Sequence, residues 1–229
     1  MNKQSEPAKF KKLSAYILPA RKTNAFENVE QGLLLFAVKT TMGEGYGSGF
    51  LMTENGYAIT CNHVIDGAVQ IKARVRIPGR IGGMDSLHDV TVIKADKKLD
   101  IALVKLEGDN FPTMQMSKDD DISVGDSIKL LGYPFGAKLS DDITKLNYSV
   151  FEGKVASIQV QHGVDTVFVD MEAKRGNSGG PVLNNETGEV IGILCGSHIE
   201  GDSRLVEEIN YIRPIKYMWE SFIDENKEN

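Results

Sequence analysis

The stretch SGFLMTENGYAIT, residues Ser48–Thr60, predicts the fold class of this chain. Two short apolar runs, Ser48–Met52 and Tyr57–Thr60, flank a turn at Glu54–Gly56. Asn and Gly tolerate the backbone angles that a tight turn between antiparallel strands requires. The stretch is therefore typical of a β-hairpin.

The same kind of pattern continues along the chain from Gln31, where apolar or alternating runs are separated by Gly, Asn and Asp. Helical periodicity between these runs is scarce, so the pattern indicates an all-β barrel or sandwich. A second hairpin is predicted around the turn Asn185–Gly188. The predicted strands are Leu33–Val38, Ser48–Met52, Tyr57–Thr60, Val69–Ile77, Val90–Asp96, Ile101–Leu106, Ser127–Gly132, Asn147–Ile158, Thr166–Asp170, Pro181–Leu183, Val190–Leu194 and Glu207–Ile212.

The strands fall into two sets, with the acidic run Lys118–Asp121 between them. This run lacks the spaced ligands of a calcium loop, so we interpret it as an exposed linker between two half-barrels. Apolar residues near helical spacing in Pro214–Asp224 predict a C-terminal helix. The expected organisation is an N-terminal segment without clear pattern (1–30), a first half (31–120), a second half (121–212) and a C-terminal helix and tail (213–229).

Charge and hydropathy limit the partners that we expect. The chain has 229 residues and a formal net charge of -6, which argues against a nucleic-acid-binding surface. No window approaches the length of a membrane-spanning helix, and the first residues contain Lys without a sustained apolar run. We therefore expect a cytoplasmic protein without a membrane or nucleic-acid partner.

The chain has two cysteines, Cys61 and Cys195, which are too few for a disulfide framework. Two buried free thiols are favoured, because no secretion signal is recognised. A single disulfide between them remains an open alternative, since the sequence does not give the distance between the two residues.

The segment GNSGGP, Gly176–Pro181, places a serine among glycines where a turn can present a nucleophile. A serine hydroxyl needs an imidazole to take its proton and a carboxylate to orient that imidazole. Of the four histidines, His63 follows an apolar strand and is the best placed. We prefer Asp100 to Asp96 as the carboxylate, because Asp100 leads directly into the strand IALVKL. Together with Ser178 these residues predict a Ser/His/Asp peptidase.

The glycines around Ser178 also have a predicted role. After attack on an acyl group, the carbonyl oxygen becomes negative and must be met by preorganised backbone amides. We expect the amides of Gly176 and Ser178 to supply this oxyanion hole. Since the base, the orienting carboxylate and the amides all come from the chain, no metal or organic cofactor is expected.

Several linked motifs resemble the chymotrypsin-fold serine peptidases, and most closely their HtrA/Deg-like branch. The matching pieces, in the order His, Asp, Ser, are GYGSGFLMTENGYAITCNHVI, DIALVKL, VGDSIKLLGYPFG, EGKVASI and RGNSGGPVLNNETGEVIGI. The resemblance spans about Leu33 to Ile215 and implies two six-stranded antiparallel β-barrels with the triad between them. It implies His63 as general base, Asp100 as its orienting residue, Ser178 as nucleophile, and Gly176 with Ser178 as the oxyanion hole.

The chain also departs from that family pattern. It ends soon after NYIRPI, so a C-terminal PDZ domain is not expected, and Asn177 replaces the aspartate that pairs with a new N-terminus in secreted trypsin-like enzymes. The residues Met171–Arg175 replace a more apolar loop. This last departure leaves the primary specificity pocket open, whereas the first two make regulation by an attached PDZ domain and zymogen activation through a new N-terminus unexpected.

The resemblance places the walls of the specificity pocket at Glu172, Ala173, Lys174 and Arg175 on one side and Leu194, Cys195 and Gly196 on the other. Glu172 would attract a basic side chain, whereas Ala173 and Leu194 would favour a small or aliphatic one. We expect a polypeptide substrate and gating by a protein partner, by homo-oligomerisation or by the N-terminal segment. The alternative is a binding module that keeps the fold without turnover.

Overall fold

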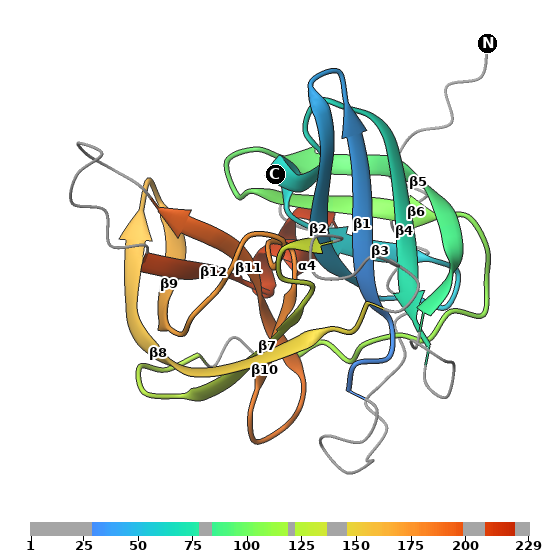
Figure 1. Ribbon diagram of the computed structural model, residues 1–229. Coiled ribbons are helices and arrows are strands. Elements are labelled where there is room, and N and C mark those ends of the chain that lie inside the picture. The colour runs from blue at the N-terminus through green and yellow to red at the C-terminus, as the bar shows by residue number, and fades with distance from the viewer. Residues whose placement is uncertain (1–28, 78–83, 119–121, 137–145, 199–208, 223–229) are drawn as a thin grey trace.

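The protein folds into two closed six-stranded antiparallel β-barrels, which confirms the predicted fold class. The computed structural model describes residues 29–77, 84–118, 122–136, 146–198 and 209–222. Most of the expected N-terminal segment and linker therefore lies outside the described residues. In Figure 1 the first barrel runs from blue to green and the second from yellow-green to red.

The first barrel has the strand order β1-β2-β3-β6-β5-β4. Its strands are β1 (Leu33–Thr40), β2 (Gly43–Leu51), β3 (Tyr57–Thr60), β4 (Ala68–Arg76), β5 (Met84–Asp96) and β6 (Ile101–Leu106), and the short helix α3 (Asn62–Ile65) follows β3. The predicted hairpin is confirmed, because β2 and β3 pair across the turn with Phe50 opposite Ile59. Gly49 lets β2 pass close to its neighbour β3, because a Cβ at this position would lie 2.5 Å from the carbonyl oxygen of Ile59.

The second barrel has the strand order β10-β11-β12-β9-β8-β7. Its strands are β7 (Ser127–Gly132), β8 (Ser149–Gln161), β9 (Val164–Asp170), β10 (Pro181–Asn184), β11 (Val190–His198) and β12 (Ile209–Pro214). The hairpin predicted around Asn185–Gly188 is confirmed by the antiparallel pairing of β10 with β11. The predicted division of the chain between residues 120 and 121 stays a prediction.

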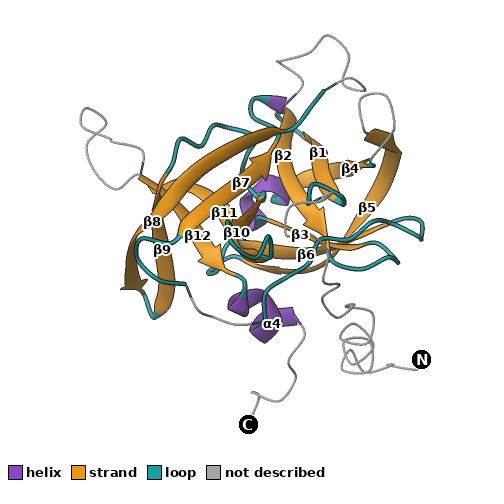
Figure 2. Ribbon diagram, turned by 90° about the horizontal axis from the view of Figure 1, so that it is seen from below, coloured by secondary structure: helices purple, strands orange, loops and turns teal. Residues whose placement is uncertain are grey.

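The two barrels share a hydrophobic core. One cluster of buried side chains contains Leu35 and Ile59 from the first barrel together with Leu131 and Ile193 from the second. The predicted C-terminal helix is α4 (Lys216–Phe222), and Figure 2 shows it lying beside the barrels. Its Phe222 belongs to the shared core cluster. The two barrels and α4 therefore pack around one continuous group of buried side chains.

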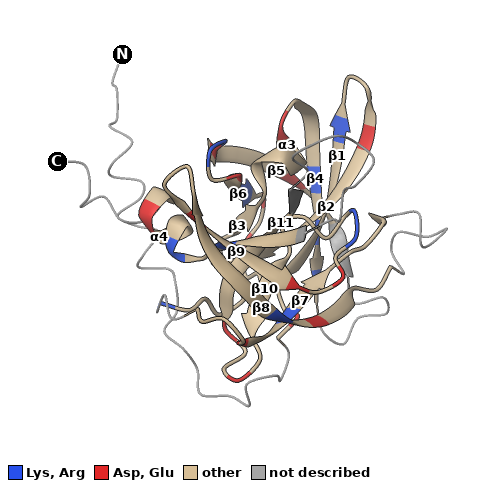
Figure 3. Ribbon diagram, turned by 90° about the vertical axis from the view of Figure 1, so that its left-hand side faces the viewer, with Lys and Arg blue, Asp and Glu red and all other residues tan. Residues whose placement is uncertain are grey.

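Charged residues are distributed over both barrels. Figure 3 shows Lys and Arg interspersed with Asp and Glu along the described ribbon. None of the described helices has the length and apolar character that crossing a membrane requires. The absence of a nucleic-acid partner stays a prediction.

Candidate active site

His63 and Asp100 are joined by two hydrogen bonds on the first barrel. The Asp100 carboxylate oxygen Oδ2 lies 2.7 Å from Nδ1 of His63, and Oδ1 accepts a hydrogen bond of 2.9 Å from the His63 backbone amide. His63 lies in helix α3, directly after β3, and Asp100 precedes β6. Since β3 and β6 are neighbouring strands, their ends hold both side chains in place. The arrangement fixes the orientation of the imidazole.

Asp100 has an unusual backbone conformation. Its φ of 57° lies in the left-handed region, which Asp adopts more readily than most residues. Asp96, the rejected candidate, has another role: its Oδ1 accepts hydrogen bonds of 2.9 Å from the amides of Lys98 and Leu99. The carboxylate that contacts His63 is therefore the one that the sequence analysis preferred.

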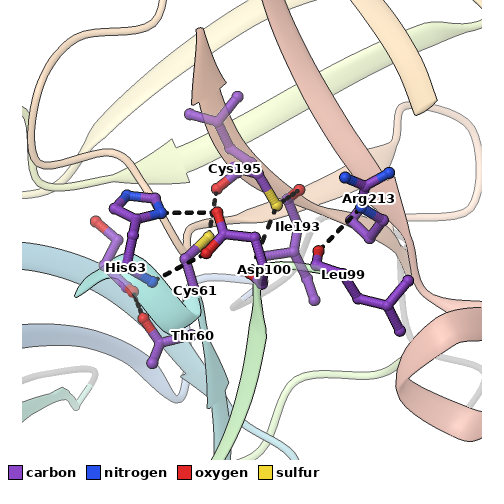
Figure 4. A network of polar contacts seen from close by, with 10 residues as sticks. Thr60, Cys61, His63, Leu99, Asp100, Ile193, Cys195 and Arg213 are labelled. Atoms are coloured by element: carbon purple, nitrogen blue, oxygen red, sulfur yellow. Dashed lines mark hydrogen bonds and ion pairs between the residues drawn. The ribbon is translucent and has the colours of Figure 1, made fainter. Parts of the chain in front are cut away.

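The second barrel supports this segment through a buried arginine. Arg213 of β12 donates from Nε to the carbonyl oxygen of Leu99, the residue before Asp100, at 3.0 Å (Figure 4). Its Nη1 also donates to the carbonyl of Asp165 and to Thr166 Oγ1. A planar guanidinium with several fixed donors is suited to such bridging. The backbone next to Asp100 is thus anchored to both barrels.

The turn that carries Ser178 is anchored by backbone hydrogen bonds. The carbonyl of Ser178 accepts a bond of 2.8 Å from the amide of Ser48, and the Gly179 amide donates to Leu194 at 2.7 Å. Ser48 Oγ donates to the carbonyl of Gly176 at 2.7 Å. Strand β2 of the first barrel and β11 of the second therefore hold the serine turn from both sides.

The amides of Gly176 and Ser178 have no hydrogen-bond acceptor among the described residues. The carbonyl of Arg175 is held by the amide of Phe135. Because carbonyl and amide point in opposite directions across a trans peptide, this bond turns the Gly176 amide away from Phe135. Gly176 itself has φ +96°, and a Cβ there would lie 2.4 Å from the Tyr133 carbonyl oxygen. Only glycine fits this turn.

Asn177 lies behind the serine turn and is fully buried. Neither Oδ1 nor Nδ2 of its side-chain amide has a hydrogen-bond partner among the described residues. Burying a polar amide without a partner costs free energy. The serine turn therefore contains a destabilising element next to its catalytic candidate.

A cleft of about 380 Å³ brings most of the predicted site residues together. His63, Asp100 and Ser178 line it, as do Ala173, Lys174, Arg175, Leu194, Cys195 and Gly196. Glu172 does not belong to this lining; its side chain is 83% exposed and pairs with Lys174 at 3.2 Å. The pocket wall is thus small and apolar at Ala173 and Leu194, which are both buried.

The sequence analysis missed Asn210 and Tyr211, which line the cleft from β12. Asn210 Nδ2 donates to the carbonyl of Met171 at 2.8 Å and so supports the start of the pocket wall. Burial raises the pKa of the Tyr211 hydroxyl, with further contributions from Cys195 and Asp100. The strand had been predicted, but its register against β9 and β11, which places these side chains, is set by tertiary pairing.

Cys61, which lies two residues before His63 in the sequence, also borders this site. Its Sγ donates to the carbonyl of Leu194 at 3.1 Å. Donor atoms of Cys61, His63 and Asp100 lie within 4.8 Å of one another, and no other such group occurs in the described part of the chain. A metal ion at this position would have to break the hydrogen bond between His63 and Asp100, so these three residues are poorly suited to bind a metal ion. The absence of a metal stays a prediction.

A family model for the trypsin-like peptidase domain matches residues 47–193, which contain His63, Asp100 and Ser178. The chain belongs to the trypsin-like peptidase family. Among curated relatives, this peptidase domain is 33% identical over 148 residues to a probable periplasmic serine endoprotease DegP-like from Hahella chejuensis. A protein of the same description from Halomonas elongata is 35% identical over 156 residues. Each match covers 64% of this chain but less than a third of the relative, 29% and 28% respectively.

Solved structures agree with the fold of this peptidase domain. The HtrA-type protease AlgW with tripeptide has a TM-score of 0.68 and 25% identity, covering 86% of this chain and 60% of that one. The serine endoprotease from Yersinia pestis has a TM-score of 0.68 at 22% identity, covering 91% and 68%, and this likeness concerns the fold. The predicted resemblance to the HtrA/Deg-like branch is therefore confirmed.

The expectation of a cytoplasmic protein is wrong. The curated relatives of this peptidase domain are named as periplasmic serine endoproteases. The expectation rested on the lack of a sustained apolar run in the first residues and of a window long enough to span a membrane. Neither property reports the compartment in which a folded barrel works.

Proposed function

We propose that the chain is a serine endopeptidase that hydrolyses peptide bonds through an acyl-enzyme intermediate. The observation that carries the proposal is the pair of hydrogen bonds between His63 and Asp100, beside a cleft that Ser178 also lines. Such a pair holds the imidazole with its proton on Nδ1, which leaves Nε2 free to act as a base. Family membership supports the same activity.

In the proposed mechanism, Ser178 Oγ attacks the carbonyl carbon of a peptide bond while Nε2 of His63 takes its proton. Asp100 stabilises the imidazolium that forms. The negative charge on the carbonyl oxygen is met by the amides of Gly176 and Ser178, for which no described residue supplies a competing acceptor.

The tetrahedral intermediate then collapses, and His63 returns the proton to the leaving amine. A water molecule, activated by the same imidazole, releases the acyl group from Ser178 and regenerates the hydroxyl. Each step uses groups that the chain itself carries.

We further propose a preference for small or aliphatic residues before the cleaved bond. Ala173 and Leu194 are buried in the cleft wall, whereas Glu172 lies outside it and pairs with Lys174. A carboxylate in this position is solvated and attracts a basic side chain only weakly. The basic preference that the sequence left open is therefore the weaker alternative.

A fluorophosphonate probe tests the proposed activity, because it reacts with an activated serine. We expect the folded chain to be labelled and Ser178→Ala to abolish the labelling. Ser127→Ala is a matched control, since Ser127 is exposed on β7 and does not line the cleft. A folded protein that stays unlabelled and cleaves no peptide from a library favours the alternative, a binding module without turnover.

Gating of the activity also belongs to the proposal. We propose that a protein partner, homo-oligomerisation or residues 1–30 would act on the serine turn. In this turn the buried side-chain amide of Asn177 has no hydrogen-bond partner among the described residues. Comparing the labelling rate of the full chain with that of a chain lacking residues before Glu30 tests the last route. An unchanged rate excludes it, and adding candidate protein partners to the same assay tests the first.

A further inference from the structure

The two cysteines of the chain meet at the junction of the barrels. Cys61 follows β3 of the first barrel, and Cys195 lies in β11 of the second. Both are free and buried. Cys61 Sγ lies 3.1 Å from the carbonyl oxygen of Leu194, the residue directly before Cys195. Figure 4 shows Cys61, Asp100 and Cys195 gathered beside His63.

The thiols touch the groups that position the proposed catalytic residues. The Leu194 carbonyl accepts from Cys61 Sγ and also from the amide of Gly179, which follows Ser178. Cys195 Sγ is 3.9 Å from the carbonyl oxygen of Asp100. Any covalent change at this pair therefore acts on both sides of the cleft at once.

We propose that Cys61 and Cys195 form a reversible disulfide that lowers the activity of the adjacent site. A disulfide has an S–S distance of about 2.05 Å, so its formation draws the sulfurs of these two free cysteines together. This movement breaks the bond from Cys61 to Leu194 and displaces Cys195 from Asp100. The effect on activity rests on the proposed peptidase function, whereas the disulfide itself does not.

The two thiols differ in access, which sets the order of the reaction. Cys195 lines the cleft, whereas Cys61 is fully buried. A small disulfide, RSSR, reaches Cys195 first: the Cys195 thiolate forms an S–S bond to one sulfur and expels the other as RSH. Cys61 then attacks the sulfur of Cys195 and expels the second RSH. Two protein thiols are oxidised, one small disulfide is reduced, and both protons leave on the expelled thiols.

The environment of Cys61 controls the second step. Burial raises the pKa of the Cys61 thiol well above its ordinary value, and Cys195 and Asp100 raise it further. Because the attacking species is the thiolate, closure of the disulfide is slow at neutral pH and accelerates as the pH rises. The pair therefore stays reduced during brief exposure to an oxidant.

The relatives of the chain are named as periplasmic proteins. The bacterial periplasm is kept oxidising, and disulfides form and persist there. A thiol pair beside a catalytic cleft would meet thiol oxidants in such a compartment. The oxidants that this disulfide requires are thus present in the compartment for which the relatives are named.

The full chain, incubated with oxidised glutathione in the presence of a chelator, tests the proposal. We expect the intact mass to fall by two hydrogens and the unfolded product to take up no iodoacetamide. Closing a loop of this length raises the Tm by about 5 °C or more. Fluorophosphonate labelling should fall at least about tenfold and return after treatment with dithiothreitol, in keeping with a displaced catalytic geometry.

Cys61→Ala serves as the matched variant, because it keeps Cys195 and removes the resolving thiol. It should gain one glutathione and never lose two hydrogens. Two alkylatable thiols in the oxidised wild type would overturn the disulfide, and a closed disulfide with unchanged labelling would overturn its effect on activity. If the reduced protein is not labelled at all, the peptidase function fails, while the mass and the Tm still decide whether the disulfide forms.

Discussion

The two sides of the cleft are held in different ways. On the first barrel, His63 and Asp100 are joined by two hydrogen bonds at the ends of neighbouring strands. On the second barrel, the serine turn contains the buried Asn177, whose side-chain amide has no hydrogen-bond partner among the described residues. The pocket wall there ends in the exposed side chains of Glu172 and Lys174. The difference teaches that the proposed base and its orienting carboxylate are preformed by two hydrogen bonds. The serine turn is held by backbone hydrogen bonds instead, and the exposed end of the pocket wall is the part that is least constrained.

Asp100→Asn breaks the preformed side and should have the largest effect. Asn tolerates the positive φ of this residue and keeps the shape, but its amide favours the wrong imidazole tautomer. We expect kcat to fall about 10⁴-fold with the fold retained. Peptide hydrolysis and circular dichroism measure the two properties.

Asp96→Asn is the control for this change, because Asp96 caps a turn four residues away and does not contact His63. Its activity should stay close to that of the wild type. Equal losses in both variants would mean that the hydrogen bonds to His63 do not set the rate.

Gly176→Ala disturbs the serine turn. The new Cβ would lie 2.4 Å from the Tyr133 carbonyl oxygen, so the turn must shift. The amides of residues 176 and 178 would then no longer point toward the substrate carbonyl oxygen. Misplacing an oxyanion donor costs about 10²–10³-fold in kcat. Gly163→Ala is the control, since Gly163 also has a positive φ of 75° but a Cβ there meets nothing within 4 Å. Only the first variant should lose labelling by the fluorophosphonate probe.

Two buried asparagines of the second barrel should differ in their contribution to the free energy of unfolding. The side-chain amide of Asn177 has no hydrogen-bond partner in the described part of the chain, whereas that of Asn210 donates to the Met171 carbonyl. Replacing an unpaired buried amide with an apolar group of similar shape is neutral or stabilising, so Asn177→Leu should not lower the free energy of unfolding. Asn210→Leu leaves a carbonyl unsatisfied and should lower it by about 1–3 kcal/mol. Urea denaturation measures both, and equal destabilisation would contradict the unpaired state of Asn177.

Glu172→Gln should have the smallest effect. Glu172 is 83% exposed and, among the described residues, pairs with Lys174 alone, so the unfolding free energy should change by less than about 0.5 kcal/mol. The cleavage preference should also stay the same, as a peptide library would show. Ala173→Leu is the contrasting variant, because it fills the cleft wall and should select smaller residues. A lost preference for basic residues in Glu172→Gln would overturn the proposed pocket.

The sequence predicted most of the fold and the chemically distinctive part of the site. Turn chemistry at Glu54–Gly56 and Asn185–Gly188 depends on neighbouring residues, so local pattern was enough to find both hairpins. Asp100 could be preferred because it leads into the buried strand β6. These features follow from the local order of apolar and turn-forming residues in the sequence.

Other features depend on contacts between distant segments and could not be predicted. The meeting of Cys61 with Cys195 and the position of Asn210 result from the pairing of barrels and strands, which no local pattern reports. Glu172 was expected in the pocket, but it lies in a segment without regular periodicity, where the direction of a side chain is not fixed by the sequence. The sequence therefore did not predict that Glu172 is exposed while the next residue, Ala173, is buried.

The buried Arg213 has a consequence for how the molecule unfolds. Its guanidinium binds Leu99 of one barrel and Asp165 of the other, and the same junction contains the shared apolar core. Separating the barrels would break the bond from Arg213 to Leu99 and expose the apolar side chains of the shared core to water, and both changes cost free energy. The two barrels should therefore melt together in a single cooperative transition, and neither half expressed alone should reach a native state.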